Sequence, residues 1–267
     1  MGALMGTITK ALDLLNHFTA ARAEIGLGEF ARLAGRDKAT VHRHLTELTG
    51  NGFLEQHPVT RAYRLGPALL RLAGVREAAF PVRKLLRPIV SALAEATGEL
   101  AHASILQGDA LSTVVHADPH LHGIQVHFDE AEVLPLHATS SGLAVLAFGP
   151  EDLRARVLSR PLTHHTGKTV TDPARLKAMI EDVRQSGLAQ SDGTFDAEVA
   201  SQGVPIYGED GRVIGALSVA VPAVRAHPDR LVEIADKLRH AARDASRSLG
   251  GAWPETHDTR RPTPAER

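Results

Sequence analysis

The stretch Leu27–Leu65, LGEFARLAGRDKATVHRHLTELTGNGFLEQHPVTRAYRL, decides the fold of the amino-terminal part of the chain. Its first segment has apolar residues three and four positions apart, which predicts one buried face on a short helix: Leu27, Phe30, Ala31 and Ala34. After a turn at Gly35-Arg36, Asp37 can cap a second helix, whose inward stripe is Val41, Leu45 and Leu48. The pattern predicts a helix-turn-helix.

A short hairpin is expected next, because Gly50-Asn51-Gly52 stops the second helix. Residues 53–56 and 62–65 are typical of two strands, joined by HPVTR. A helix in the major groove with a basic hairpin beside it is suited to duplex DNA. The candidate DNA-contacting residues lie on the outward side of the second helix or on the hairpin: Lys38, Thr40, His42, Arg43, Arg61 and Arg64. The competing interpretation is a solvated basic surface, with His42 in a packing role.

This region resembles the winged helix-turn-helix of the IclR family of bacterial transcription regulators. The resemblance is carried, in order, by TKALDLLNHF, GEFARLAG, KATVHRHL, GFLEQ and YRLGPALLRLA. Within it, residues 38–44 read KATVHRH, which departs from the family's usual Lys-Ser-Thr-Val-His-Arg-Leu run at Ala39 and His44. The resemblance implies binding to a double-stranded DNA operator.

Length and composition suit a two-domain protein of the cytoplasm. The chain has 267 residues, more than one average domain, and no cysteine, which excludes disulfides and thiolate sites. Apolar runs are short and no signal peptide opens the chain, so we expect a cytoplasmic protein with no membrane partner. Residues 1–87 hold thirteen Lys and Arg against seven Asp and Glu, although the whole chain has a net charge of −1. A basic half joined to an acidic half fits a DNA-binding module attached to a sensing domain.

Four segments are expected along the chain. They are a winged helix-turn-helix DNA-binding domain at 1–66, a helical linker and dimerisation region at 67–96, an effector-binding domain at 97–249 and a disordered tail at 250–267. The linker has apolar residues with no obvious partner in a small winged helix: Leu69, Leu70, Leu72 and Val75. They could pack against a second copy, since reading two half-sites needs a two-fold dimer. For residues 82–96, packing onto the next domain is an equal alternative.

Beyond Gly98 the pattern predicts an α+β domain. Strands are expected at 101–106, 110–116, 123–128, 187–192, 197–207 and 213–221. Helices are expected within 136–148, after a small-residue loop, and at 151–158, 172–185 and 228–249. Helices that flank a mostly antiparallel sheet define the α+β class. The resemblance continues through TGELAHASIL, PLHATSSGLAVLAF, TVTDPARLKAMI, GLAQSD and GRVIGALSVAVP, covers about residues 7–248, and implies a GAF-like effector domain.

The candidate effector site is the small-residue loop of that domain: Ala138, Thr139, Ser140, Ser141 and Gly142. If its amide groups open a helix, they can hold a carboxylate with help from the hydroxyls. The alternative is a plain helix cap. The resemblance implies that the strands at Ser201 and Ser218 line the same cup, with Ser201 standing where the family often has cysteine. His102 and Asp192 are further candidates, with the alternative that each only satisfies neighbouring backbone groups.

Histidines are dense between residues 102 and 137: His102, His116, His120, His122, His127 and His137. With Asp118 and Asp129 they raise the alternative of a metal-binding sensor or a small-molecule enzyme. Their spacing matches no tight motif, so we expect no metal ligands and no cofactor. Gly167-Lys168-Thr169 resembles the end of a P-loop, but Leu162 stands where that motif needs glycine. We therefore expect no enzyme activity.

The favoured interpretation is a ligand-responsive transcription regulator of the IclR type. It would bind an operator as a homodimer or a dimer of dimers. The resemblance implies a small organic acid, aromatic acids included, as its effector. Repression and activation remain equally open.

Overall fold

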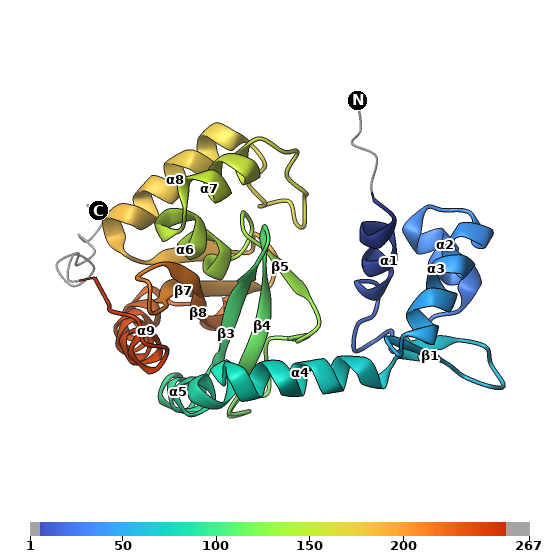
Figure 1. The fold of residues 1–267 in the computed structure, drawn as a ribbon. Helices are drawn as coiled ribbons and strands as arrows, with labels where there is room; N and C mark the ends of the chain where they lie inside the picture. The colour runs from blue at the N-terminus through green and yellow to red at the C-terminus, as the bar shows by residue number, and fades with distance from the viewer. Residues whose placement is uncertain (1–5, 255–267) are drawn as a thin grey trace. The chain divides into compact units, whose positions relative to one another are not determined.

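The computed structural model describes residues 6–254, and Figure 1 shows their fold. The chain divides after Pro81 into two compact units, Met1–Pro81 and Val82–Arg267. The first residues of the expected disordered tail are ordered, because Gly250 forms a β-bridge with Gly208 and the Trp253 ring packs edge-on against Tyr207 at 6.0 Å. The rest of that expected tail, 255–267, lies outside the described residues.

The first unit is a winged helix-turn-helix. Its elements are α1 (Thr7–Leu15), α2 (Leu27–Ala34), α3 (Lys38–Gly50), β1 (Leu54–Gln56), β2 (Tyr63–Leu65) and α4 (Pro67–Ala79). Strands β1 and β2 pair antiparallel and form the predicted hairpin. The Phe30 ring lies at the centre of the core, with edge-on contacts to Phe18 at 5.6 Å and Tyr63 at 6.2 Å. Burial of these apolar rings stabilises a unit that is small for an independent core.

Local sequence signals set the helix-turn-helix geometry. Gly35 ends α2 in the left-handed region at φ 59°, where a residue with a Cβ is disfavoured. Asp37 Oδ1 then accepts a 2.8 Å hydrogen bond from Thr40 N and caps α3. The Arg36 guanidinium donates to Lys10 O and Asp13 Oδ2, both at 2.9 Å, and thereby fastens α1 to the turn. The predicted helix pair and its cap are confirmed.

The second unit is built on a six-stranded antiparallel sheet. Its strands are β3 (Leu100–Gln107), β4 (Ala110–Ala117), β5 (Val133–Pro135), β6 (Ala189–Asp192), β7 (Val199–Tyr207) and β8 (Val213–Pro222), in the order β5-β4-β3-β8-β7-β6. Its helices are α5 (Val82–Thr97), α6 (Ser140–Phe148), α7 (Glu151–Leu158), α8 (Pro173–Ser186) and α9 (Pro228–Ser248), with a short 3-10 turn, η1, at Ala223–Arg225. This is the α+β class expected from the sequence.

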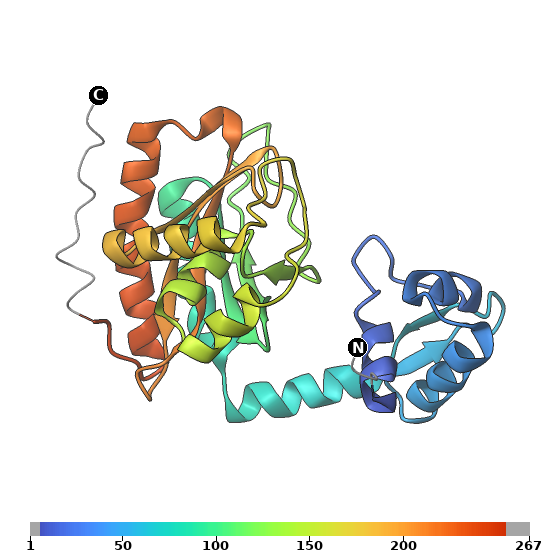
Figure 2. The same cartoon turned by 90° about the horizontal axis from the view of Figure 1, so that it is seen from above.

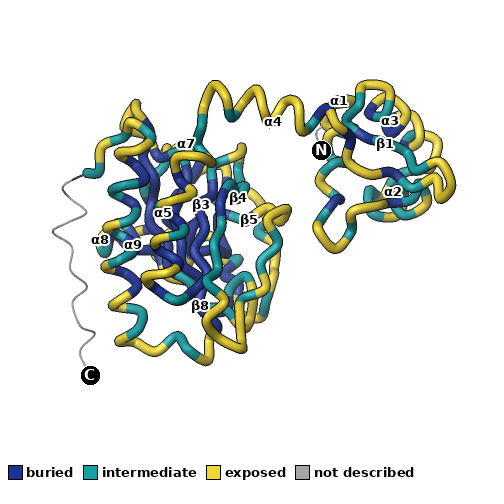
Figure 3. Tube along the Cα trace, turned by 90° about the horizontal axis from the view of Figure 1, so that it is seen from below, coloured by how far each residue is buried: buried dark blue, intermediate teal, exposed yellow. Residues whose placement is uncertain are grey.

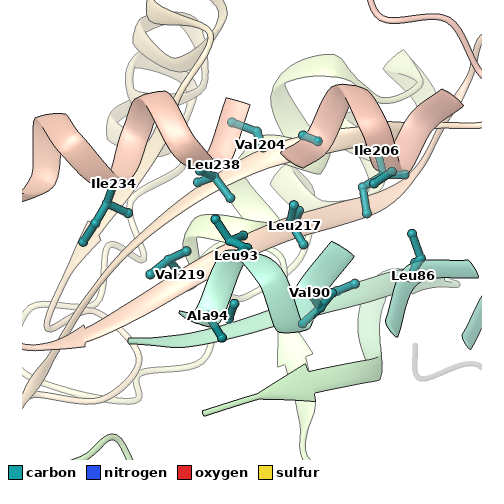
Figure 4. Packing of buried hydrophobic residues seen from close by; sticks show 14 of the residues in the cluster. Leu86, Val90, Leu93, Ala94, Val204, Ile206, Leu217, Val219, Ile234 and Leu238 are labelled. Carbon is teal, nitrogen blue, oxygen red and sulfur yellow. The ribbon is translucent and has the colours of Figure 1, made fainter. Parts of the chain in front are cut away.

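Each face of the sheet has its own helical cover. In Figure 1, α6, α7 and α8 lie above the sheet, and α5 and α9 lie below it; Figure 2 shows the length of α9. Figure 3 shows the strands of the sheet as mostly buried. Alternate residues of β3, β7 and β8 pack against α5 and α9, as Figure 4 shows for Val204, Leu217 and Val219. The intervening residues face α6 and are smaller and more polar, which leaves that side free to form a site.

The segment 118–132, which we call the strap, corrects one sequence expectation. The strand expected at 123–128 is absent, and β5 forms instead at Val133–Pro135. Two aspartates divert the backbone at the ends of the strap: Asp118 accepts from His120 N at 2.8 Å, and Asp129 accepts from Ala131 N at 2.9 Å. Such local side-chain bonds compete with strand pairing.

No helix in the described part of the chain is long and apolar enough to cross a membrane.

Candidate functional site

The outward side of α3 presents unpaired cations. Lys38, His42 and Arg43 are exposed and Thr40 is half-buried, whereas Val41 and Leu45 are fully buried on the opposite side. Among residues 6–254, neither Lys38 nor Arg43 has an ion-pair partner. An exposed cation without an internal partner is available to a phosphate or a base edge.

The hairpin presents two arginines in different states. Arg61 is exposed at its tip with φ 61°, and its backbone N donates to His57 O at 3.0 Å. Arg64 is exposed on β2, but its Nη2 lies 2.8 Å from Glu55 Oε2 on the paired strand. Arg61 therefore contributes an uncompensated positive charge, whereas the charge of Arg64 is offset by its neighbour.

His44, which stands where the family usually has leucine, is an inward-facing residue of α3. It is 4% exposed, and its Nε2 has no hydrogen-bond partner within the described chain. Burial, followed by the nearby Arg43 and Arg36, lowers the pKa of His44. The neutral ring therefore packs in the core as an apolar residue would.

A hollow of about 610 Å³, counting its open mouth, lies in the second unit beside the start of α6. It is lined by His102, Val126, His127, Phe128, Glu132, Leu134, Thr139, Ser140, Ser141, Ser191, Phe195, Asp196, Val199, Ser201 and Ala220. Its mixture of apolar walls with a few convergent polar groups is typical of a small-molecule site. The sequence-predicted residues that it brings together are His102, Thr139, Ser140, Ser141 and Ser201.

The first turn of α6 forms a polar part of the wall. Thr139 Oγ1 accepts from Gly142 N at 3.0 Å and donates to Pro135 O at 2.9 Å, so this threonine is the helix cap. Ser201 Oγ on β7 donates to Ser140 Oγ at 2.8 Å. The first amide groups of a helix have no intrahelical acceptor, and its dipole favours negative charge there. This turn can therefore accept a carboxylate.

His102 adds a buried imidazole to the same wall. It is 6% exposed, and its Nδ1 lies 3.1 Å from Ser104 Oγ, which lies 3.2 Å from Thr113 Oγ1. Burial, and then the nearby His116, lowers the pKa of His102 to about 4, so the ring is neutral near pH 7. Phe128 of the strap lies against both rings, at 5.1 Å from His102 and 5.3 Å from His116.

Four sequence-predicted residues lie outside the hollow. Ala138 O accepts from Thr194 Oγ1 at 2.6 Å, and Gly142 packs against the Leu136 backbone. Asp192 is exposed and forms an ion pair with Lys168 at 3.0 Å. Ser218 is fully buried on β8 opposite His102, and its Oγ has no hydrogen-bond partner among residues 6–254.

Sequence reasoning missed the residues that close the hollow. Val126, His127, Phe128 and Glu132 come from the strap, and Phe195, Asp196 and Val199 come from the segment that joins β6 to β7. The alternating apolar residues of the strap predict a strand and not a site, because the approach of these loop positions to α6 depends on the sheet. The apolar pair Val126 and Phe128 in a polar loop was the one available sign.

Of the dense histidines, His102 and His116 are cross-strand neighbours, whereas His116, His120 and His137 each have a partner that is not a histidine. His116 Nδ1 lies 2.8 Å from Glu130 Oε1, His120 Nδ1 lies 2.9 Å from Gln125 Oε1, and His137 Nε2 lies 2.9 Å from Thr163 O. In the described ranges, no group of three or more His, Cys, Asp or Glu residues is placed to hold a metal ion. The described geometry gives no support to the metal-sensor alternative.

Comparisons with known proteins give consistent results for both units. The IclR helix-turn-helix domain model matches residues 7–58, and the model for the carboxy-terminal domain of the bacterial transcriptional regulator IclR matches residues 78–247. The regulator BhcR of Paracoccus denitrificans is 31% identical over 90% of this chain and 85% of its own length. The repressor IclR of Escherichia coli is 25% identical over 92% of this chain and 90% of its own length.

Solved structures agree with these matches. A regulator of the IclR type from a Silicibacter species has a TM-score of 0.84 and 47% identity, and the match covers 94% of this chain and 99% of that chain. An IclR homologue of Microbacterium hydrocarbonoxydans, solved in complex with 4-hydroxybenzoate, has a TM-score of 0.72 and 27% identity, over 91% of this chain and 99% of that chain.

Proposed function

The chain belongs to the IclR family of bacterial transcriptional regulators, with a DNA-binding helix-turn-helix and an effector-binding carboxy-terminal domain. We propose that it binds its operator through α3 and the hairpin, and that it senses a small organic acid in the hollow beside α6. Family members are transcription regulators, not enzymes. In this proposal, residues 1–66 read DNA and 97–249 sense the effector in the cytoplasm. Of the segment 67–96, α4 links the two units and contributes to dimerisation, whereas α5 packs in the core of the second unit.

The observation that carries the DNA-binding half is the division of α3 into two sides. Val41 and Leu45 are fully buried, whereas Lys38 and Arg43 are exposed and free of ion pairs within the described chain. This division supports α3 as the helix that enters the major groove, with Lys38 and Arg43 on its free side. Arg61 extends the same basic character onto the hairpin.

The effector half rests on the hollow beside α6. Amide groups of the first turn of α6 and the hydroxyl of Ser140, which accepts from Ser201 and keeps its own proton, can hold a carboxylate there. The relative that holds 4-hydroxybenzoate supports an organic acid, aromatic acids included, as the effector class.

A homodimer, or a dimer of dimers, follows from the geometry of operators. Paired winged helices read half-sites about 34 Å apart. Helix α4 and the residue that follows it have apolar side chains exposed to an unusual degree, namely Leu70 at 79%, Val75 at 62% and Phe80 at 67%. These side chains support a contact with a second copy, and sedimentation of wild type against Leu70→Glu with Val75→Glu tests it: the variant should sediment as a smaller species.

Effector binding must change operator affinity by the coupling free energy between the two sites. The experiment is a fluorescence-anisotropy titration of an operator duplex, selected from random sequences, with and without candidate carboxylic acids. We expect Ser140→Ala with Ser141→Ala to abolish the effector response and to leave operator affinity unchanged. Loss of operator affinity in that variant, or an intact response, contradicts the proposed site.

A further inference from the structure

The mouth of the hollow carries two carboxylates with no lysine or arginine opposite them, and the imidazole of His127 is the basic group that lines it beside Glu132. The carboxylates Glu132 and Asp196 line it, and the lining includes no lysine or arginine. Lys168 is engaged with Asp192 outside the hollow. Partial burial, followed by the carboxylates of Asp129 and Asp196, raises the pKa of Glu132. A ligand that is only anionic would meet this repulsion as it enters.

Two phenylalanine rings stand in the same hollow. Phe128 comes from the strap, and Phe195 comes from the segment between β6 and β7, next to Asp196. Aromatic faces attract cations, most strongly where solvent is partly excluded. Two rings with two carboxylates therefore form a surface suited to an ammonium group.

The inner wall offers the opposite chemistry. His102 is 6% exposed and lines the hollow together with Ser140 and Ser141 at the start of α6. Its Nδ1 is engaged with Ser104, and no hydrogen-bond partner for its Nε2 occurs in the described chain. In the tautomer in which Nδ1 accepts from Ser104, Nε2 carries a proton that it can donate. The inner wall therefore has donors for a carboxylate, whereas the mouth has acceptors for a cation.

The strap that supplies part of this mouth is held in place by a buried ion pair. Arg225 Nε and Nη2 donate to the two carboxylate oxygens of Glu99 at 3.1 and 2.6 Å, and its Nη1 donates to Ile124 O at 2.6 Å. Glu99 is 3% exposed. Fixed groups of opposite character at the two ends of a hollow favour a ligand of matching polarity, because less ordering is needed on binding.

We propose that the effector is a zwitterion: a carboxylic acid that also carries an amino or quaternary ammonium group, with the carboxylate at the start of α6 and the cation between Phe128, Phe195 and the Glu132–Asp196 pair. This inference rests on the proposed function for the location of the effector site. It narrows the class from organic acids in general to those with a compensating positive charge.

Three compounds of equal chain length test the inference: 5-aminopentanoate, pentanoate and glutarate, which end in an ammonium, a methyl and a second carboxylate. Their dissociation constants are measured by calorimetry on the full chain. We expect 5-aminopentanoate to bind at least about tenfold more tightly than pentanoate, and glutarate to bind most weakly. Equal or tighter binding of pentanoate or glutarate overturns the inference, and so does failure of all three to bind.

Substitution of the two mouth carboxylates by their amides tests whether the preference for 5-aminopentanoate depends on their charge, because the side chains keep nearly the same shape. In Glu132→Gln with Asp196→Asn, the preference for 5-aminopentanoate over pentanoate should vanish; Asn keeps the oxygen that accepts from Glu198 N. Glu198→Gln is the matched control, because Glu198 is an exposed carboxylate two residues away that does not line the hollow. An unchanged preference in the double variant, or an equal loss in the control, contradicts the inference.

The operator titration distinguishes this failure from failure of the proposed function. If pentanoate or glutarate binds more tightly than 5-aminopentanoate and changes operator affinity, the proposed function is supported and the zwitterion inference is wrong. If 5-aminopentanoate binds as expected and operator affinity does not change, the zwitterion inference is supported and the proposed coupling between the effector site and DNA binding is wrong.

Discussion

Ser201 Oγ donates a 2.8 Å hydrogen bond to Ser140 Oγ, which joins the middle of β7 to the first turn of α6. Two residues further along β7 and on the same face, Gly203 lies against that turn. At Gly203 the sheet and the helix start therefore meet backbone to backbone. This close approach brings the α6 amides to the wall of the hollow.

Gly203→Ala should separate the two elements. The added Cβ would lie 2.7 Å from the Ser140 carbonyl carbon and 2.8 Å from Ser141 N, and backbone atoms have little room to move. We expect a loss of about 2 kcal/mol in the free energy of unfolding, measured by urea denaturation. Gly123→Ala, where nothing lies within 4 Å of the new Cβ, is the control. Equal stability of the two variants would show that α6 can shift freely.

The two hairpin arginines should differ in their contribution to operator binding. Arg61 has no ion-pair partner among residues 6–254, whereas Arg64 lies 2.8 Å from Glu55. We expect Arg61→Ala to lower operator affinity by about fivefold at fixed salt, because a free cation neutralises a phosphate. Arg64→Ala should lower it less, since its charge is already offset. A larger loss for Arg64→Ala in the same anisotropy titration would reverse this assignment.

The Glu99–Arg225 pair should stabilise the second unit and its strap. Glu99→Gln leaves the partly exposed Arg225 guanidinium without its buried carboxylate, and we expect a loss of about 2 kcal/mol in urea denaturation. Glu233→Gln removes a carboxylate from an exposed cluster with Arg230 and Lys237, and it should change stability little. The account fails here if both variants lose the same stability.

Acid should destabilise the second unit through His102. Burial, together with His116, lowers its folded pKa to about 4, below the unfolded value of 6.5. The unfolded chain therefore binds a proton first, and stability falls as the pH drops from about 6.5 toward 4, by up to about 3 kcal/mol. Above pH 6.5 the residue contributes no pH dependence.

His102→Gln should flatten the stability profile in this window, measured as the free energy of unfolding between pH 7 and 5. His240→Gln, at an exposed position of α9, is the control and should retain the slope of the wild type. Part of the slope remains in His102→Gln, because burial also lowers the pKa of His165 in the same unit. Identical slopes for His102→Gln and wild type would mean that the His102 ring takes up a proton readily when folded.

The sequence predicts the helix-turn-helix well because its determinants are local. The cap at Asp37, the turn at Gly35 and the stripe at Val41 and Leu45 each act within a few residues. The same holds for α6, whose cap at Thr139 follows from a small-residue run before an apolar helix.

The mouth of the hollow could not be predicted, because it depends on contacts between distant segments. Ile124 is held by Arg225 of η1, and Phe128 is held by rings on β3 and β4. The expected strand at 123–128 was wrong for the same reason, since alternating apolar residues there serve the hollow and not a strand ladder. Successive side chains of β6 point to opposite faces of the sheet. Ser191 therefore lines the hollow, whereas the next residue, Asp192, points away from it and pairs with Lys168.

The most direct test of the account compares the operator affinity of Arg43→Ala with that of wild type. The affinity is measured by fluorescence anisotropy at fixed salt on a duplex selected from random sequences, and Val59→Ala, at an exposed position of the hairpin, is the control. Arg43 is exposed on the outward side of α3 and unpaired in the described chain, so we expect its loss to weaken binding by about tenfold while effector affinity is unchanged. Equal operator affinity for wild type and Arg43→Ala would contradict DNA reading by α3.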